Sequence, residues 1–393
     1  MNLRPDQGQT VQLDEIRRRE LRRERWRLKR AAEGLLRNTP VEHCCRSVIG
    51  GAVYIRQAEG ERRAFYHNIA KCKSRWGCPV CAPQLTERDQ VKLRDALTIW
   101  KSSGGETYLV TFTIRHDRSM PTRDAVKGLL AAQNKMKAWR AYKAIMNRAG
   151  AAGSITAREI SFGENGPHPH VHMLILAKPG MLDELGKVRE LWADAVRRQG
   201  LEDVNEHGFD VRGGDYAAEY VAKYGKEPSA DSKRTVRAWW NVSDEMTRGH
   251  TKQTRRLGGA TPFTLLRWYA DGDKEAGAVF ADYFDTMRGR SQLHWSKGLR
   301  AKLDLFCLER AEVEKPKARN LVQIDFDTWG AVLRHNGRWE LLYVAEQYGP
   351  DAVEVLLDRM RRSPGRWRGD FRTTDPLSGR WMPGYYEPLQ AAA

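Results

Sequence analysis

Residues 155–177 read ITAREISFGENGPHPHVHMLILA, and this stretch decides the fold. Two runs rich in β-branched and apolar residues, 155–162 and 170–177, flank a segment that contains Asn165-Gly166. An Asn-Gly pair between two such runs is the strongest short-range signal for a β-hairpin. The sequence therefore predicts two antiparallel strands joined by a tight turn.

Three side chains of this hairpin are candidate metal ligands. Alternate side chains of a strand share a face, so His170 and His172 point the same way. A turn made by Asn165-Gly166 places Glu159 opposite His172, whereas a turn centred one residue earlier places it opposite His170. In either register the three residues share a face, with facing Cβ atoms about 4.5–5.5 Å apart. Glu164 is the reserve ligand, and a surface histidine cluster before a buried strand is the alternative interpretation.

The segments around the hairpin predict an α+β fold. Residues 107–115 form a further strand, and 85–102, 123–148 and 182–199 have the composition and spacing of helices. Strands separated by helices, with one adjacent hairpin, indicate a central antiparallel sheet flanked by helices. The expected parts of the chain are a basic helical arm at 1–39, a cysteine-rich zinc-binding segment at 40–84, an α+β core at 85–227, a basic loop with a helical extension at 228–312, and a linker with a small accessory region at 313–393.

Five of the six cysteines fall in the first quarter of the chain. Cys72, Cys78 and Cys81 have the spacing of a structural zinc site, since Cys-x-x-Cys is a frequent zinc-binding pair. A closed tetrahedral site needs a fourth ligand, for which Cys45 is the first candidate and Cys44 an alternative. His67 and His43 are further alternatives for the fourth position. A redox dithiol is the competing interpretation, but it leaves the remaining clustered cysteines unexplained.

Residues 216–226 carry three tyrosines at spacings of four, which places them on one face of a helix. An aromatic stripe packed into a core is the simplest interpretation. Lys223 and Lys226 argue against complete burial, because unpaired lysine is rarely buried. A cation beside Tyr220 or Tyr224 also favours phenoxide, since free tyrosine titrates near pH 10.

The overall charge restricts the class of partner. The 393 residues include 67 Lys plus Arg and 50 Asp plus Glu, for a formal charge of +17. Such a surplus attracts polyanions, with nucleic acid as the first candidate and an anionic membrane as the second. No apolar run has the 18 or more residues of a membrane span, and the arginine-rich N-terminus lacks the apolar core of a secretion signal. The sequence thus predicts a cytoplasmic protein that makes no use of a membrane.

Several motifs, taken together and in their order along the chain, resemble one family. HPHVHMLIL resembles the HUH motif (histidine, hydrophobic residue, histidine) of replication initiators, relaxases and related transposases. CKSRWGCPVCA and TYLVTFTIRHD are similar to the cysteine segment and first strand motif of rolling-circle plasmid Rep proteins. YVAKYGK resembles the motif of phage initiators that carry two tyrosines. Two later segments, TPFTLLRWYADGD and GRSQLHWSKGLRAKL, are similar to C-terminal stretches of the same plasmid family, so the resemblance spans about residues 40–310.

The resemblance implies an HUH endonuclease-like sheet with a helix that carries the tyrosines packed over the metal face. It implies that His170 and His172 bind catalytic Mg²⁺ or Mn²⁺, with Glu159 as a third ligand whose spacing varies within the superfamily, and that Zn²⁺ is structural. Tyr220 and Tyr224 match the two phage tyrosines. Arg115, Lys223 and Lys226 are the accompanying cations: Lys223 acts beside the nucleophile, and Arg115 and Lys226 contact DNA.

The tyrosine motif departs from the phage pattern in one respect. After Tyr224 the lysine follows two residues later instead of three, whereas Tyr220 keeps Lys223 at the expected distance. This favours Tyr220 as nucleophile. Some plasmid relatives have a glutamate at the position of Tyr220 and the nucleophile at that of Tyr224, so both tyrosines remain candidates.

The activity that the resemblance implies is initiation of rolling-circle replication. A tyrosine cuts single-stranded or hairpin origin DNA, leaving a 5′-phosphotyrosine and a 3′-OH that primes synthesis. A host polymerase and a host helicase are expected partners, because no Walker-type GxxxxGK[ST] motif is present. The alternatives are a transposase or mobilisation relaxase with the same chemistry, and a non-catalytic, zinc-containing DNA-binding regulator. A mononuclear iron oxygenase fits less well, because its usual ligand spacing is absent.

Overall fold

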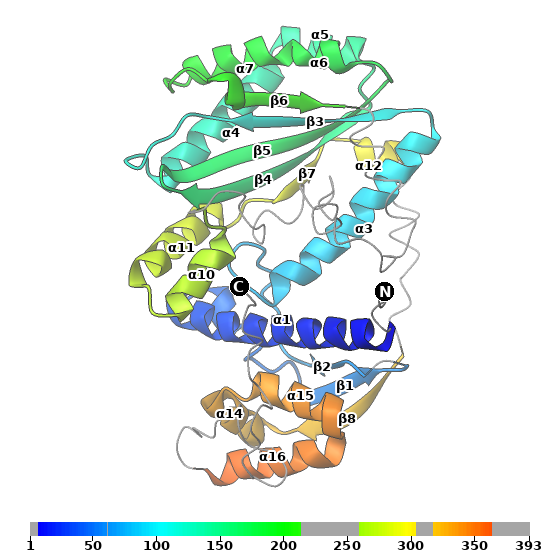
Figure 1. Ribbon diagram of the computed structural model, residues 1–393, viewed down its shortest axis with the longest axis vertical. Helices are drawn as coiled ribbons and strands as arrows, with labels where there is room; N and C mark the ends of the chain where they lie inside the picture. Colours follow the sequence, from blue (N-terminus) through cyan, green and yellow to red (C-terminus); the bar gives the residue numbers. More distant parts are fainter. Residues whose placement is uncertain (1–6, 61, 214–258, 304–316, 364–393) are drawn as a thin grey trace, which may run out of the picture. The chain divides into compact units, whose positions relative to one another are not determined.

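The computed structural model describes residues 7–60, 62–213, 259–303 and 317–363. The chain divides into two compact units (Figure 1). The first combines residues up to 74 and 78–80 with residues from 313 onward, and the second contains 75–77 and 81–312. The predicted α+β class is confirmed, since both units pair an antiparallel sheet with helices. Tyr220, Lys223, Tyr224 and Lys226 lie outside the described residues.

The second unit is built on a five-stranded sheet with the order β6-β3-β5-β4-β7. Every neighbouring pair in this sheet is antiparallel. Its strands are β3 (Glu106–Thr113), β4 (Gly153–Gly163), β5 (Gly166–Ala177), β6 (Phe209–Arg212) and β7 (Leu293–Trp295). The strand that carries the histidines, β5, is the central strand of this sheet.

The β4–β5 hairpin has the second of the two registers expected from the sequence. Gly163 pairs with Gly166, so that Glu159 lies opposite His170. Gly166 has a φ of +83°, which a residue with a side chain rarely adopts. A Cβ atom there would also lie 3.1 Å from the Cα atom of Arg118. The glycine of the Asn-Gly pair is therefore needed just after the turn, as in hairpins with a type I turn and a G1 bulge.

Helices cover both faces of this sheet (Figure 1). We call the face with Ala157 and Leu174 the front face and that with Thr156 and Met173 the back face. Among its described residues, the unit has the helices α3 (Cys81–Ser102), α4 (Thr122–Ala138), α5 (Arg140–Arg148), α6 (Leu182–Gly186), α7 (Val188–Arg197), η1 (Glu206–Gly208), α10 (Pro262–Ala270), α11 (Lys274–Met287) and α12 (Leu299–Lys302). Apolar side chains of α3 and α12 form one core with the front face. On the back face, Tyr142 of α5 contacts Met173 and Trp192 of α7 packs on Phe112.

Two expected helices are interrupted. The sequence predicts one helix over 123–148, but the chain turns at Trp139, where φ is −68° and ψ is 144°. This extended residue lets α4 and α5 pack at different angles over the back face. The segment 182–199 likewise divides into α6 and α7. Helical spacing alone does not reveal such breaks, because residues on both sides keep an apolar face.

The first unit joins the two ends of the chain. Its sheet has the order β2-β1-β8, and β8 comes from the C-terminal region. The elements of this unit are α1 (Gln7–Leu35), α2 (Pro40–His43), β1 (Val53–Ala58), β2 (Ala64–His67), β8 (Ala318–Ile324), α14 (Phe326–His335), α15 (Arg338–Tyr348) and α16 (Pro350–Arg362). The sequence predicts three separate parts here, an N-terminal arm, a zinc-binding segment and an accessory region. In the structure, β1 and β2 of the second part pair with β8 of the third in one sheet, and α1 of the first part packs against the same core.

Tyr66 lies at the centre of that core. Its ring packs edge-on against Trp26 of α1 and Trp329 of α14, with centroids 6.0 and 5.2 Å away. Its hydroxyl donates to the carbonyl oxygen of Arg338 over 2.7 Å. Burial raises the pKa of Tyr66 well above its usual value, and this hydroxyl stays protonated at neutral pH. Tyr66 therefore joins the N-terminal and C-terminal segments through both aromatic packing and a buried hydrogen bond.

Glu340, in the first turn of α15, makes the stability of this unit depend on pH. Burial raises its pKa to about 7, although Arg23 and Arg338 act in the opposite direction. The unfolded chain releases this proton near pH 4.5, so the folded state loses relative stability as pH rises from about 4.5 to 7. We expect Glu340→Gln to stabilise the protein at pH 8 by about 1–3 kcal/mol and to have little effect at pH 4.5. Urea unfolding of both proteins at the two pH values measures this, and an equal effect at both would contradict it.

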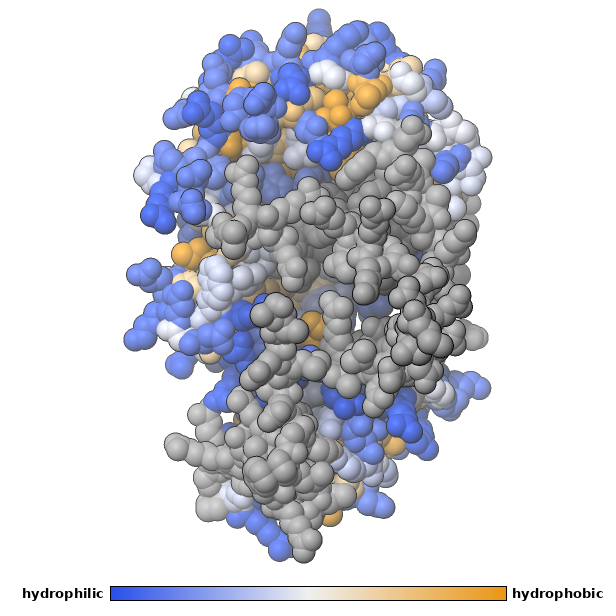
Figure 2. All heavy atoms as spheres, viewed as in Figure 1, coloured by the Kyte–Doolittle hydropathy of each residue, from blue (hydrophilic) through white to orange (hydrophobic). Residues whose placement is uncertain are grey.

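None of the helices in the described residues has the length and apolar character of a membrane span. Hydrophilic residues make up most of the coloured surface in Figure 2.

Candidate metal centre

Glu159, His170 and His172 converge on the front face of the second unit. The Nε2 atoms of His170 and His172 lie 3.3 and 3.6 Å from Oε2 of Glu159. Ligand atoms from all three residues fall within 4.8 Å of one another. The side chain of His170 is 12% exposed and those of the other two are 6% exposed, so the group opens to solvent on the His170 side. The structure thus brings together the three ligands predicted from the hairpin.

The far nitrogen of each imidazole ring is held by an oxygen atom. Nδ1 of His172 lies 3.0 Å from Oγ1 of Thr111, on the neighbouring strand β3. Nδ1 of His170 lies 3.3 Å from the carbonyl oxygen of His168. When Nδ1–H donates to these oxygens, Nε2 keeps its lone pair and points toward Glu159. Metal-binding histidines are usually oriented in this way.

This donor set fits a divalent metal ion. Two neutral imidazoles and one carboxylate provide three ligands on one side, and they leave the exposed side for water or substrate oxygen. A set that includes imidazole suits Mn²⁺ better than Mg²⁺, because Mg²⁺ prefers ligands that are all oxygen. The positions of Glu159 and the two histidines follow from the β4–β5 register. Thr111 was not predicted, since its role depends on the pairing of β3 with β5.

Two more histidines extend the group toward the turn of the hairpin. Nε2 of His116 lies 2.5 Å from Nδ1 of His168, and the His168 ring centroid is 5.3 Å from that of His170. Burial, together with His170 and His116, lowers the pKa of His168 to about 3. No local pattern singles out His116, because it follows β3 and is distant from the hairpin in sequence.

Arg115 lies just beyond the end of β3. Its side chain is 55% exposed and forms a 3.3 Å ion pair with Glu202. An exposed ion pair of this kind is weak, so the guanidinium can exchange Glu202 for a phosphate. Its role in contacting DNA stays a prediction.

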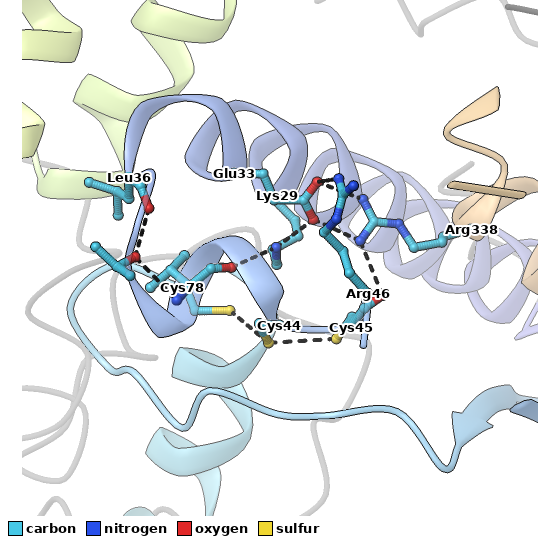
Figure 3. Close-up of polar contacts among 10 residues, drawn as sticks. Lys29, Glu33, Leu36, Cys44, Cys45, Arg46, Cys78 and Arg338 are labelled. Carbon is cyan, nitrogen blue, oxygen red and sulfur yellow. Dashed lines mark hydrogen bonds and ion pairs between the residues drawn. The ribbon is translucent and has the colours of Figure 1, made fainter. Parts of the chain in front are cut away.

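Four cysteines form a second group of metal-ligating side chains. The Sγ atoms of Cys44, Cys72, Cys78 and Cys81 lie within 4.8 Å of one another. Those of Cys78 and Cys44 are 3.6 Å apart (Figure 3). Two thiolates on one tetrahedral zinc ion, with Zn–S bonds of about 2.3 Å, are separated by about 3.8 Å. The backbone N–H of Ser74 also donates to Sγ of Cys72 over 3.4 Å, which stabilises a thiolate.

The structure selects Cys44 over Cys45 as the fourth member of this group. The sequence predicts Cys45 as the fourth ligand, with Cys44 as an alternative. Sγ of Cys45 lies 3.7 Å from that of Cys44, but the group of four contains Cys44. The backbone of Cys45 is left-handed, with a φ of +58°, and its N–H and carbonyl bond to Ala70 and Arg338. Because of this left-handed backbone, the two adjacent cysteines differ in orientation, and the sequence alone does not reveal the difference.

Cys44→Ser and Cys45→Ser therefore form a matched pair of variants. We expect the first to lower bound zinc by most of one equivalent, because one of four ligands is removed. The second should keep its zinc, because Cys45 has a backbone role. Atomic emission on the purified full chain measures zinc content directly. Equal zinc content in the two variants would contradict the assignment of Cys44.

The chain is similar to curated proteins of Streptomyces. It is 27% identical over 364 residues to "Protein rep" of Streptomyces lividans, an alignment that covers 73% of this chain and 77% of that protein. It is 34% identical over 151 residues to the "Neomycin resistance protein" of Streptomyces cyanogenus, covering 32% of this chain and 34% of that protein. The chain thus aligns with about a third of this second relative. No family model and no solved structure matches the chain.

Proposed function

We propose that this protein initiates rolling-circle replication by cutting single-stranded DNA with a tyrosine beside a divalent metal ion. The observation that carries the proposal is the convergence of the two Nε2 atoms of His170 and His172 on one carboxylate oxygen of Glu159. The name of the Streptomyces lividans relative, "Protein rep", favours replication over transposition or mobilisation. The charge of +17 supports a nucleic-acid substrate.

Glu159, His170 and His172 would hold the ion, Mn²⁺ or Mg²⁺. When bound, it offsets the charge that develops on the scissile phosphate during phosphoryl transfer. Thr111 and the carbonyl of His168 fix the imidazole rings, so that no reorientation of the ligands is needed during the reaction. The front face at His170 is the open side, where a single strand can approach.

The covalent step exchanges one phosphodiester for another. The phenol oxygen of Tyr220 or Tyr224 forms a bond to phosphorus, and the bond from phosphorus to the 3′ oxygen breaks. The phenolic proton is released, and the leaving 3′ oxygen takes up a proton. The products are a 5′-phosphotyrosine and a free 3′-OH that a host polymerase extends. Because a phosphodiester is conserved, the reverse reaction rejoins strands without ATP. Lys223 favours the phenoxide form by its charge.

The cysteine group supports the same proposal in a structural role. Zn²⁺ held by Cys44, Cys72, Cys78 and Cys81 would fix the segment that precedes α3. A closed set of four thiolates is typical of structural zinc and leaves no position for substrate.

A covalent adduct assay tests this function. The full chain is incubated with Mn²⁺ and a pool of single-stranded oligonucleotides of random sequence that carry a 3′ label. We expect a labelled protein band on a denaturing gel, because the protein stays attached to the 5′ phosphate of the 3′ fragment. Chelation by EDTA should abolish the band, and a 5′-labelled pool should give only a free, shortened strand.

Variants identify the nucleophile in this assay. The double variant Tyr220→Phe with Tyr224→Phe should form no adduct, whereas Tyr216→Phe, in the same motif, should form it normally. An adduct that persists in the double variant overturns the tyrosine assignment. Binding of DNA without any adduct, in the parent protein, indicates a non-catalytic regulator.

A further inference from the structure

A cluster of basic side chains lies on the back face of the second unit, behind the candidate metal centre. It contains Lys137 of α4, Arg158 of β4, Arg290 after α11, and His294 of β7. Thr156 pairs directly with His294 in the β4–β7 ladder, and Arg158 follows two residues later on the same face of β4. The guanidinium of Arg158 also donates to the carbonyl oxygen of Ser291 over 2.6 Å, which ties it to the segment between Arg290 and His294.

The charged groups that shift the pKa values of Lys137, Arg158 and His294 are all cationic. Burial lowers the pKa of Lys137, and Arg158 lowers it further. Burial and Arg290 lower the pKa of Arg158. The pKa of His294 is lowered by burial, Lys137 and Arg158. Gathering like charges without a carboxylate costs free energy, and a bound anion removes that cost.

Each of three elements also contributes a buried polar side chain next to its cation. Gln133 lies one helical turn before Lys137 on α4, and Thr156 lies two residues before Arg158 on β4. Arg290 follows the end of α11, and its Nε donates to the carbonyl oxygen of Thr286 over 2.9 Å. Gln133, Thr156 and Thr286 are 3%, 3% and 4% exposed. Nε2 of Gln133 and the hydroxyls of both threonines have no hydrogen-bond partner within the described part of the chain.

Nε of Arg158 is a further buried donor without a partner among the described residues. Buried donors are nearly always hydrogen-bonded, and leaving one unpaired costs free energy. Amide, hydroxyl and guanidinium groups can all donate to the oxygens of a single anion. A phosphate group has both the charge and the several acceptor oxygens that this set of donors requires.

We propose that the cluster formed by Lys137, Arg158, Arg290 and His294, with Gln133, Thr156 and Thr286 beneath it, binds a phosphate group. A DNA backbone passing over the back face can supply that phosphate, and this source rests on the proposed function. A free phosphate is the second source. The site differs from the metal centre in its position, since Arg158 and Glu159 point to opposite faces of β4.

The experiment compares two double variants of the full chain. Lys137→Gln with Arg290→Gln removes two cations of the cluster. Lys135→Gln with Arg288→Gln removes the same charges two residues away, and Lys135 points to another side of α4. Neither pair belongs to the metal centre. Because the first variant relieves like-charge repulsion, it should melt no lower than the control variant.

Fluorescence anisotropy with a labelled single strand, at several salt concentrations, tests the DNA source. The cluster variant should bind about tenfold more weakly than the control, and the magnitude of its slope of log affinity against log salt should fall by about 0.7 for each phosphate that it no longer neutralises. Binding is measured without Mn²⁺, so the result is independent of cleavage. If the parent protein binds the single strand normally but forms no covalent adduct, the proposed function is refuted and the proposed phosphate site is not.

Thermal melting in phosphate, against chloride at equal ionic strength, tests the free source. If phosphate raises the Tm of the control variant but not that of the cluster variant, the site binds free phosphate. A changed salt slope assigns it to DNA. If the two double variants agree in both the salt slope and the phosphate-dependent Tm, the proposal is overturned.

Discussion

Replacing His170 with alanine should lower Mn²⁺ affinity by about 100-fold or more and abolish adduct formation. Removal of a group that only orients a ligand already reduces affinity or activity by about 10–100-fold, so removal of a ligand itself should cost at least as much. His170 is the most exposed of the three candidate ligands, and its replacement leaves the bond between Thr111 and His172 in place. The fold should therefore survive this substitution better than it survives His172→Ala.

Mn²⁺ binding is measured by electron paramagnetic resonance in the absence of DNA, and adduct formation is measured separately. His207→Ala is the matched control, because His207 belongs to the same unit and its side chain is 81% exposed. Thr111→Val should produce a smaller decrease in affinity, since it removes only the acceptor for Nδ1 of His172. If His170→Ala binds Mn²⁺ as tightly as the control, then the site on the front face is not the metal site.

Glu33→Gln should destabilise the first unit by about 3–5 kcal/mol. Glu33 accepts from Lys29 over 2.5 Å and from Arg338 over 2.7 Å (Figure 3). Lys29, Glu33 and Arg338 are only 0%, 7% and 2% exposed. Burial acts to raise the pKa of Glu33, but Arg338 and Lys29 together lower it below its usual value. Glutamine keeps the shape of the side chain and leaves two buried cations without their shared anion.

Glu24→Gln is the control for this prediction. Glu24 lies on the same helix and forms an ion pair with Arg27, but these two side chains are 27% and 37% exposed. Such a pair contributes about 1 kcal/mol or less. Urea unfolding at pH 7 compares the two variants. Equal decreases in stability would show that the buried ion cluster does not hold α1 against α15.

The ion cluster also explains why the two ends of the chain were not expected to meet. In the sequence, Lys29 and Glu33 belong to the basic helical arm, and no pattern distinguishes Arg338 from the other arginines of the accessory region. The burial of these three side chains becomes evident only when α15 packs on α1. Beside the buried Leu28 and Ala32 of α1, the paired charges of Lys29, Glu33 and Arg338 occupy this interface.

The sequence by itself determined the central hairpin, the faces of its side chains and the class of the fold. Alternation along a strand has a period of two, so the choice of face for Glu159, His170 and His172 needed no long-range information. The cysteine spacing likewise restricted the candidate zinc site to a few possible ligands. These are local properties, which follow from backbone geometry over a few residues.

Only the tertiary structure decided which distant segments meet. Three features join residues that are far apart in the chain: the pairing of β8 with β1, the contact of Thr111 with His172, and the basic cluster on the back face. A fourth, the choice of Cys44 over Cys45, depends on one backbone angle. Side-chain packing and hydrogen bonding across such separations depend on the whole fold, and no local pattern encodes them.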